Sequence, residues 1–121
     1  MANSNGVTKF SKVEAKGFIP TSYELTASGA CPSGTQAVEL NHATVVVAAT
    51  ITPVQGVLFV KDTSASGTAA HTLTLAAGYT FDGTNNTATL NAPNEALCVY
   101  IDSAGNGTIL ENVGTVALSS V

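Results

Sequence analysis

Few side chains in this sequence have the chemistry of a catalytic or metal site, and they are widely spaced. The only histidines are His42 and His71, 29 residues apart. A zinc site needs three or four ligands, usually with local spacing, and the sequence places no further ligands beside these two. We therefore predict no metal site and expect both histidines to be exposed or to cap local structure.

Three aspartates open polar stretches at intervals of 20 residues: Asp62, Asp82 and Asp102. Each follows an apolar run. The stretches after Asp82 and Asp102 are rich in oxygen atoms but lack the alternating acidic positions of a calcium loop. We interpret them as Asx-type turns, in which the carboxylate accepts hydrogen bonds from the backbone that follows.

Nucleophilic catalysis would need a serine or cysteine beside one of the histidines. The sequence has no Gly-x-Ser-x-Gly motif, no cysteine-protease signature and no phosphate-binding loop. Its eight acidic residues offer no special pair for glycoside hydrolysis. We predict that the chain is not an enzyme, with no catalytic residues and no cofactor.

The two cysteines, Cys31 and Cys98, lie in different surroundings. Cys31 is in a turn-like stretch with glycine and proline, whereas Cys98 lies in an apolar run and is expected to be a small buried side chain. A disulfide between them requires a geometry that the sequence does not supply. The sequence leaves their pairing open.

Segments of alternating or continuous apolar residues, separated by turn residues, would position these groups. Alternation with a period of two is typical of half-buried strands, and the nearest helical candidate is a single turn at residues 93–96. We predict an all-β fold, a meander that forms a compact antiparallel β-sandwich or barrel of about eight strands. The predicted strands are residues 37–42, 43–53, 57–61, 71–75, 87–92, 97–101, 108–113 and 116–119.

The sequence divides at residue 36. We predict that residues 1–36 form an extended N-terminal arm with one or two short strands, and that residues 37–121 form the β-domain. We expect the continuous apolar runs 57–60 and 97–101 to lie in the core. Scattered apolar residues of the arm either dock on another protein or cover the edge of the domain's own core: Phe10, Val13, Phe18, Ile19 and Tyr23.

Charged residues make up only 10% of the chain, against about a quarter in typical globular domains. Since a soluble monomer usually carries more charge, we expect neighbouring subunits or a larger assembly to cover much of the surface. The alternative is a secreted or engineered β-domain with a neutral surface. The chain has four lysines, no arginine and a net charge of −4, so we predict no nucleic-acid partner.

No membrane association is predicted. The longest apolar run, residues 43–51, is too short to span a bilayer. Residues 1–6 lack the basic and apolar regions of a signal peptide, so we expect synthesis in a cytoplasm.

Residues 38–121 resemble the β-rich end domains of small bacteriophage virion proteins, among them head decoration (cement) proteins, head fibres and tail-fibre tips. Many such domains carry a tryptophan after the glycine-rich turn, where this chain has Ile109 and Leu110. The segments that carry the resemblance are residues 44–49, 56–62, 72–75, 90–97 and 102–110.

The resemblance implies a structural protein of the capsid exterior, commonly a homotrimer, that binds the major capsid protein lattice and stabilises the shell. The arm residues from Phe10 to Tyr23 would then contact the capsid. The alternative is a receptor- or carbohydrate-binding fibre tip, for which Tyr79 is the side chain expected to face a ligand.

Overall fold

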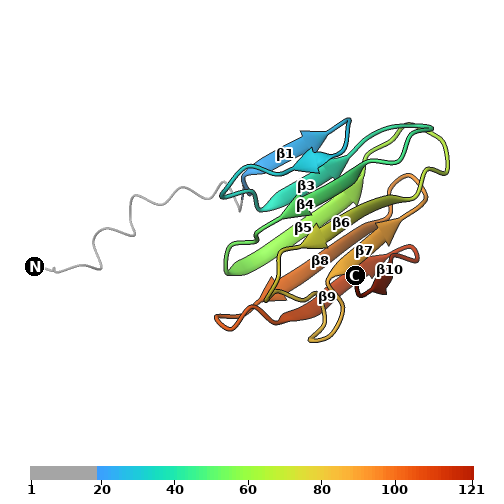
Figure 1. The fold of residues 1–121 in the computed structure, drawn as a ribbon. Helices are drawn as coiled ribbons and strands as arrows, with labels where there is room; N and C mark the ends of the chain where they lie inside the picture. Colours follow the sequence, from blue (N-terminus) through green and yellow to red (C-terminus); the bar gives the residue numbers. More distant parts are fainter. Residues whose placement is uncertain (1–18) are drawn as a thin grey trace, which may run out of the picture.

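The computed structural model describes residues 19–121, which form ten strands and no helix. Two five-stranded sheets pack face to face, with β1 near one end of the stack and β9 and β10 near the other (Figure 1). In spatial order, sheet A consists of β1 (Ser22–Leu25), β3 (Ala37–Leu40), β5 (Gly56–Asp62), β8 (Ala96–Ile101) and β9 (Gly107–Val113), and sheet B of β10 (Ala117–Ser119), β7 (Thr87–Leu90), β6 (His71–Leu75), β4 (Ala48–Ile51) and β2 (Gly29–Ala30).

The predicted all-β class is confirmed, but the predicted antiparallel meander is wrong. From β1 to β6 successive strands alternate between the sheets, so that β1, β3 and β5 run parallel in sheet A and β2, β4 and β6 run parallel in sheet B. Among the described residues, consecutive strands pair only in the hairpins β6–β7 and β8–β9. Both sheets are therefore mixed, and neither closes into a barrel.

The crossing of the chain between sheets has a simple physical reason. Alternating apolar residues specify which face of a strand is buried, whatever the neighbouring strand is. The linker at residues 52–55 joins β4 to β5; four residues can span about 13 Å, while packed sheets lie about 10 Å apart. A short linker can therefore cross to the other sheet as readily as it can turn back.

The core lies between the sheets and is built mainly from alternate residues of the strands β3 to β8, together with Val47, Phe81 and Val116 from connections. In the central strand β5, Leu58 and Val60 are buried, and Phe59 between them is only partly buried on the outer face of sheet A. In β8 the buried residues are likewise Leu97, Val99 and Ile101. The prediction that the continuous runs lie in the core is thus right for these residues and wrong for the outward-facing ones, because a strand of a single sandwich has only one inner face. The outward-facing residues are Val57, Phe59, Tyr100 and Cys98, which was itself expected to be buried.

Two short strands lie within the range predicted to be the arm. β1 pairs with β3 from Ser22↔Ala37 to Leu25↔Leu40, and β2 pairs with β4. Residues 22–30 therefore contribute one strand to each sheet. The division of the chain at residue 36 stays a prediction.

Candidate functional site

A serine and a histidine lie side by side where the β3–β4 and β5–β6 connections meet. Ser64 Oγ is 3.2 Å from Nε2 of the fully buried His71. Nδ1 of His71 accepts a hydrogen bond from the Val47 N–H at 3.0 Å, so the proton of the neutral ring is on Nε2. Because Nε2 is a donor in this arrangement, it cannot take a proton from Ser64, and the pair is not a nucleophile with its base.

The same residues hold two loops together. Ser64 Oγ donates to the His42 carbonyl and accepts from the His42 N–H, both at 3.1 Å, and His42 Nδ1 accepts from the N–H groups of Thr44 and Val45 at 3.1 and 2.9 Å. These bonds fix residues 42–47 as a loop, which is why the strand predicted for residues 43–53 begins only at Ala48. Both histidines cap backbone groups as predicted, but His71 does so from the interior.

Gly67 shows how closely the two loops approach. Its φ is +100°, and a Cβ built there would lie 1.8 Å from the Ala43 carbonyl oxygen. Only glycine combines this backbone conformation with this contact. The Ser64–His71 region is therefore a structural junction.

The three evenly spaced aspartates form the same turn. Oδ1 accepts from the backbone N–H two residues later: Asp62 from Ser64 at 2.9 Å, Asp82 from Thr84 at 3.0 Å and Asp102 from Ala104 at 2.9 Å. The predicted Asx-type turns are confirmed. At Asp82, hydrogen bonds from the backbone and side chain of Asn85 lower the carboxyl pKa. Residues 19–121 contain no group of three or more His, Cys, Asp or Glu side chains that could hold a metal ion.

Glu95 is a buried acid for which sequence reasoning found no role. Its Oε1 accepts from the Asn91 N–H at 2.9 Å, and Oε2 accepts from the N–H and hydroxyl of Thr115 at 3.1 and 3.0 Å. Burial raises the pKa of Glu95, but the hydrogen bonds from Asn91 and Thr115 outweigh it and leave the pKa below its usual value. Glu95 thus joins the β7–β8 connection to the β9–β10 turn as a carboxylate.

The outer faces of the two sheets differ in chemistry. On sheet B the outward residues are mainly hydroxyl-bearing: Thr72 pairs with Thr89, and Thr74 pairs with Thr87 with their hydroxyls 3.1 Å apart. On sheet A the outward positions of β5 and β8 are apolar. They include Val57, Phe59, Cys98 and Tyr100, and Tyr100 is 42% exposed.

A groove of about 350 Å³, here named the sheet-A groove, lies on this apolar face. Ser22, Ala37, Phe59, Cys98 and Glu111 form one row across the five strands. The adjacent row consists of Glu24, Glu39, Lys61, Ala96 and Val113. Among the residues that the structure describes, the middle of the face is therefore apolar apart from Lys61, and its two sides are acidic.

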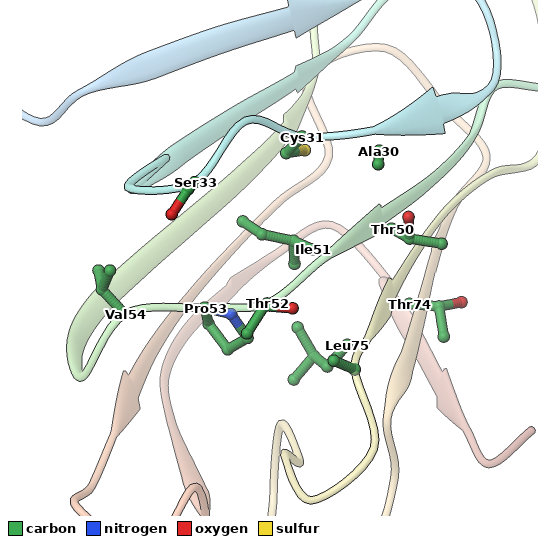
Figure 2. Close-up of a pocket in the computed structure, with 11 residues that line it drawn as sticks. Ala30, Cys31, Ser33, Thr50, Ile51, Thr52, Pro53, Val54, Thr74 and Leu75 are labelled. Carbon is green, nitrogen blue, oxygen red and sulfur yellow. The ribbon is translucent and has the colours of Figure 1, made fainter.

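A second hollow, of about 620 Å³, lies beside the ends of β2, β4 and β6 (Figure 2). Thr50 and Thr74 come from neighbouring strands, and the hollow also includes Cys31, Pro53 and Val54. The described residues that line it contribute no carboxylate, ammonium or imidazole group. It offers hydroxyl and apolar contacts to a neutral ligand.

The cysteines do not pair with each other. Both are free thiols: Cys31 borders the second hollow, and Cys98 lies in the sheet-A groove. Burial raises the pKa of the Cys31 thiol. The pKa of the Cys98 thiol is also raised, mainly by burial and to a smaller extent by the nearby Glu111 carboxylate. Neither thiol has the lowered pKa of a reactive nucleophile.

The residues predicted to bind partners are not brought together. Phe10, Val13 and Phe18 lie outside the described residues. Ile19 is 78% exposed just before β1, and Tyr23 is 41% exposed in that edge strand. Tyr79 packs against the core and is only partly exposed, beside the Gly105 turn. Their predicted binding roles stay predictions.

The sheet-A groove itself was missed, although the sequence carries a signal for it. Residues 57–61 and 97–101 are continuous apolar runs, whereas residues 71–75 and 87–92 alternate with threonine. A continuous run indicates a strand covered on both faces. Among residues 19–121, sheet B covers the inner face of β5 and β8, and the outer face carries the sheet-A groove.

Comparison with known proteins adds no family assignment. No protein-family model matches the chain, and no curated protein matches it. Among residues 19–121 there is no helix with the length and apolar character needed to cross a bilayer.

Proposed function

We propose that this chain is a structural virion protein that decorates a bacteriophage capsid from the outside, as a homotrimer bound to the major capsid protein lattice. The observation that carries the proposal is the apolar outer face of sheet A. Large apolar patches on soluble proteins mark interaction surfaces. The sequence resemblance to phage virion proteins supplies the identity of the assembly.

The distribution of charge supports the same proposal. Residues 19–121 contain seven acidic residues and one lysine, Lys61. The threonine face of sheet B and the apolar face of sheet A leave little ionic surface to keep a lone copy dispersed. Contact with other copies and with a shell would cover such a surface.

The groups with reactive potential support a structural role. Ser64, His71 and Glu95 each satisfy backbone groups in loop junctions. In each case hydrogen bonds to the backbone occupy the side-chain oxygen or nitrogen atoms that would act in catalysis.

The proposal is tested by adding the purified protein to empty shells of the phage that encodes it and measuring binding by co-sedimentation. We expect saturable binding and a higher temperature of shell disruption. Removal of residues 2–20 is expected to weaken binding, because Phe10, Val13, Phe18 and Ile19 are predicted to contact the shell. Absence of binding by the full chain would contradict the proposed function; full binding by the shortened chain would contradict only the role of the arm.

A second candidate is a carbohydrate-binding fibre tip, which the uncharged second hollow favours. The hydroxyls of Thr50 and Thr74 are suited to hydrogen bonds with a neutral sugar. This candidate predicts glycan-array binding that Thr74→Val weakens at the hollow, or that Tyr79→Ala weakens if Tyr79 faces the ligand as predicted. It also predicts that the protein is dispensable for shell stability.

A further inference from the structure

We infer that residues 9–18 of one copy lie across the sheet-A groove of a neighbouring copy. The inference deepens the proposed function, since it rests on the proposed homotrimer and assigns the contact that builds it. Residues 9–18 lie outside the described part of the chain, and only their sequence enters here.

The first support is charge complementarity. Three of the four lysines of the chain, Lys9, Lys12 and Lys16, fall in this short segment, together with one acid, Glu14. Within residues 19–121, the outer face of sheet A carries the acids Glu24, Glu39 and Glu111 and the cation Lys61. The segment is therefore basic and the face acidic, which favours their association.

The same comparison disfavours two sheet-A faces packed against each other. Each face would bring an excess of acid to the other, and like charges across an interface are costly. A basic occupant removes this repulsion. Its apolar residues, Phe10, Val13 and Phe18, are suited to the apolar middle of the groove around Ala37, Phe59 and Cys98.

Length permits the contact. Ten residues span about 33 Å when extended, whereas the four strand spacings across a five-stranded sheet amount to about 19 Å. A segment of this size can cross the whole face and still leave residues for the connection between copies.

The start of β1 fixes the point at which the segment joins the domain. Thr21 is fixed beside β3, because its carbonyl accepts from the N–H groups of Gln36 and Ala37 at 2.8 and 3.0 Å. Pro20 restricts Ile19 to extended conformations, and Ile19 is 78% exposed. The segment therefore joins the edge strand of sheet A through an exposed, extended residue, from which a neighbouring copy is within reach.

Such a contact is heterologous: each copy donates a segment and accepts one. Heterologous contacts close into rings when the rotation between copies allows it, and three copies so joined would give the proposed homotrimer. In this arrangement Phe10, Val13 and Phe18 pack in the groove in place of the direct shell contact predicted from the sequence, and the outward side of the segment is left to face the shell.

Cys98 provides a direct probe because it lies in the groove. In a Cys31→Ser background, we would measure the rate of maleimide reaction at Cys98 in the full chain and after removal of residues 2–18. Removal should raise the rate by about tenfold, as for a site occupied about nine-tenths of the time, and dilution of the full chain should raise it similarly. Equal rates of maleimide reaction in the two proteins would overturn the inference. Protection of Cys98 that does not change on dilution would also overturn it, because the groove would then be occupied by the chain's own segment.

A disulfide trap identifies the donor of the segment. With Cys31→Ser and Phe10→Cys, mild oxidation by diamide joins the introduced thiol to Cys98 only where they meet. We expect covalent oligomers of up to three chains on a non-reducing gel, and none when Thr84→Cys, at the exposed β6–β7 turn, replaces Phe10→Cys. A cross-linked monomer, or the same oligomers from the Thr84 control, would contradict exchange between copies.

Charge reversal tests the recognition itself. Two variants should each expose Cys98 to maleimide: one reverses the charge of the groove by Glu39→Lys and Glu111→Lys, and the other reverses the charge of the segment by Lys9→Glu, Lys12→Glu and Lys16→Glu. A variant that carries all five substitutions should restore the protection of Cys98. If Cys98 stays exposed in the variant with all five substitutions, charge does not determine the recognition.

These tests use the isolated protein without shells. If residues 2–18 can be removed while the three-chain mass and the protection of Cys98 remain, the inference fails and the proposed function stands. If the full chain protects Cys98 on dilution but never binds shells, both the exchange and the shell function are contradicted.

Discussion

His71 and His42 both accept hydrogen bonds from backbone N–H groups, but in different surroundings. The bond from Val47 to His71 is buried, whereas those from Thr44 and Val45 to His42 are at the surface. We expect His71→Phe to lower the free energy of unfolding by about 1–3 kcal/mol, since the buried Val47 N–H loses its acceptor. His42→Phe should cost less than about 1 kcal/mol, because water can replace the lost acceptor. Urea unfolding of the two variants measures this, and equal losses would contradict the assigned tautomer and junction.

Glu95 predicts a specific dependence of stability on pH. Its folded pKa is lowered, so its carboxylate stabilises the fold above the ordinary glutamate pKa, and this contribution is lost as the pH falls through the lower folded value. Glu95→Gln should cost about 1.5–3 kcal/mol at neutral pH, since a charged acceptor is lost, and should flatten the acid part of the stability curve. The control Asp82→Asn, in an exposed turn, should stay within about 0.5 kcal/mol at neutral pH. An unchanged acid limb in Glu95→Gln would refute this role.

The elements of the fold are predicted by the sequence more completely than their pairing. The eight strands expected after residue 36 are present, and β1 and β2 are short strands of the kind expected before it. The turns at Asp82 and Asp102 were identified from residues that favour turns. Strand order was beyond reach, because a period of two is the same in parallel and antiparallel sheets. The groove was missed because Phe59 was assigned to the core from the continuous run around it, although only Leu58 and Val60 face inward.

Phe59 and Leu58 form a matched pair for testing which face of β5 is the inner one. Leu58 is 2% exposed, so Leu58→Ala should cost about 2–5 kcal/mol through the cavity it leaves. Phe59→Ala should cost only about 1–2 kcal/mol in a single copy, because the ring is partly buried on the outer face. Thermal or urea unfolding at low protein concentration measures both. A larger loss for Phe59→Ala would show that the outer face of sheet A is covered within one chain.

At the scale of the whole molecule, charge and apolar surface are distributed unevenly. Cationic residues are concentrated in residues 9–16 and acidic residues in the domain, while sheet A presents an apolar face and sheet B a threonine face. The acid-flanked apolar face of sheet A and the basic segment are complementary in character. Association of copies would pair them, which is the physical basis of the proposed virion role.

The molecular mass of the purified protein in solution, measured by analytical ultracentrifugation or light scattering, tests association most directly. We expect a mass near three times the 12.1 kDa of one chain, decreasing toward a single chain on dilution. A monomer that persists at high protein concentration would contradict the account, because the apolar face of sheet A would then need no neighbour.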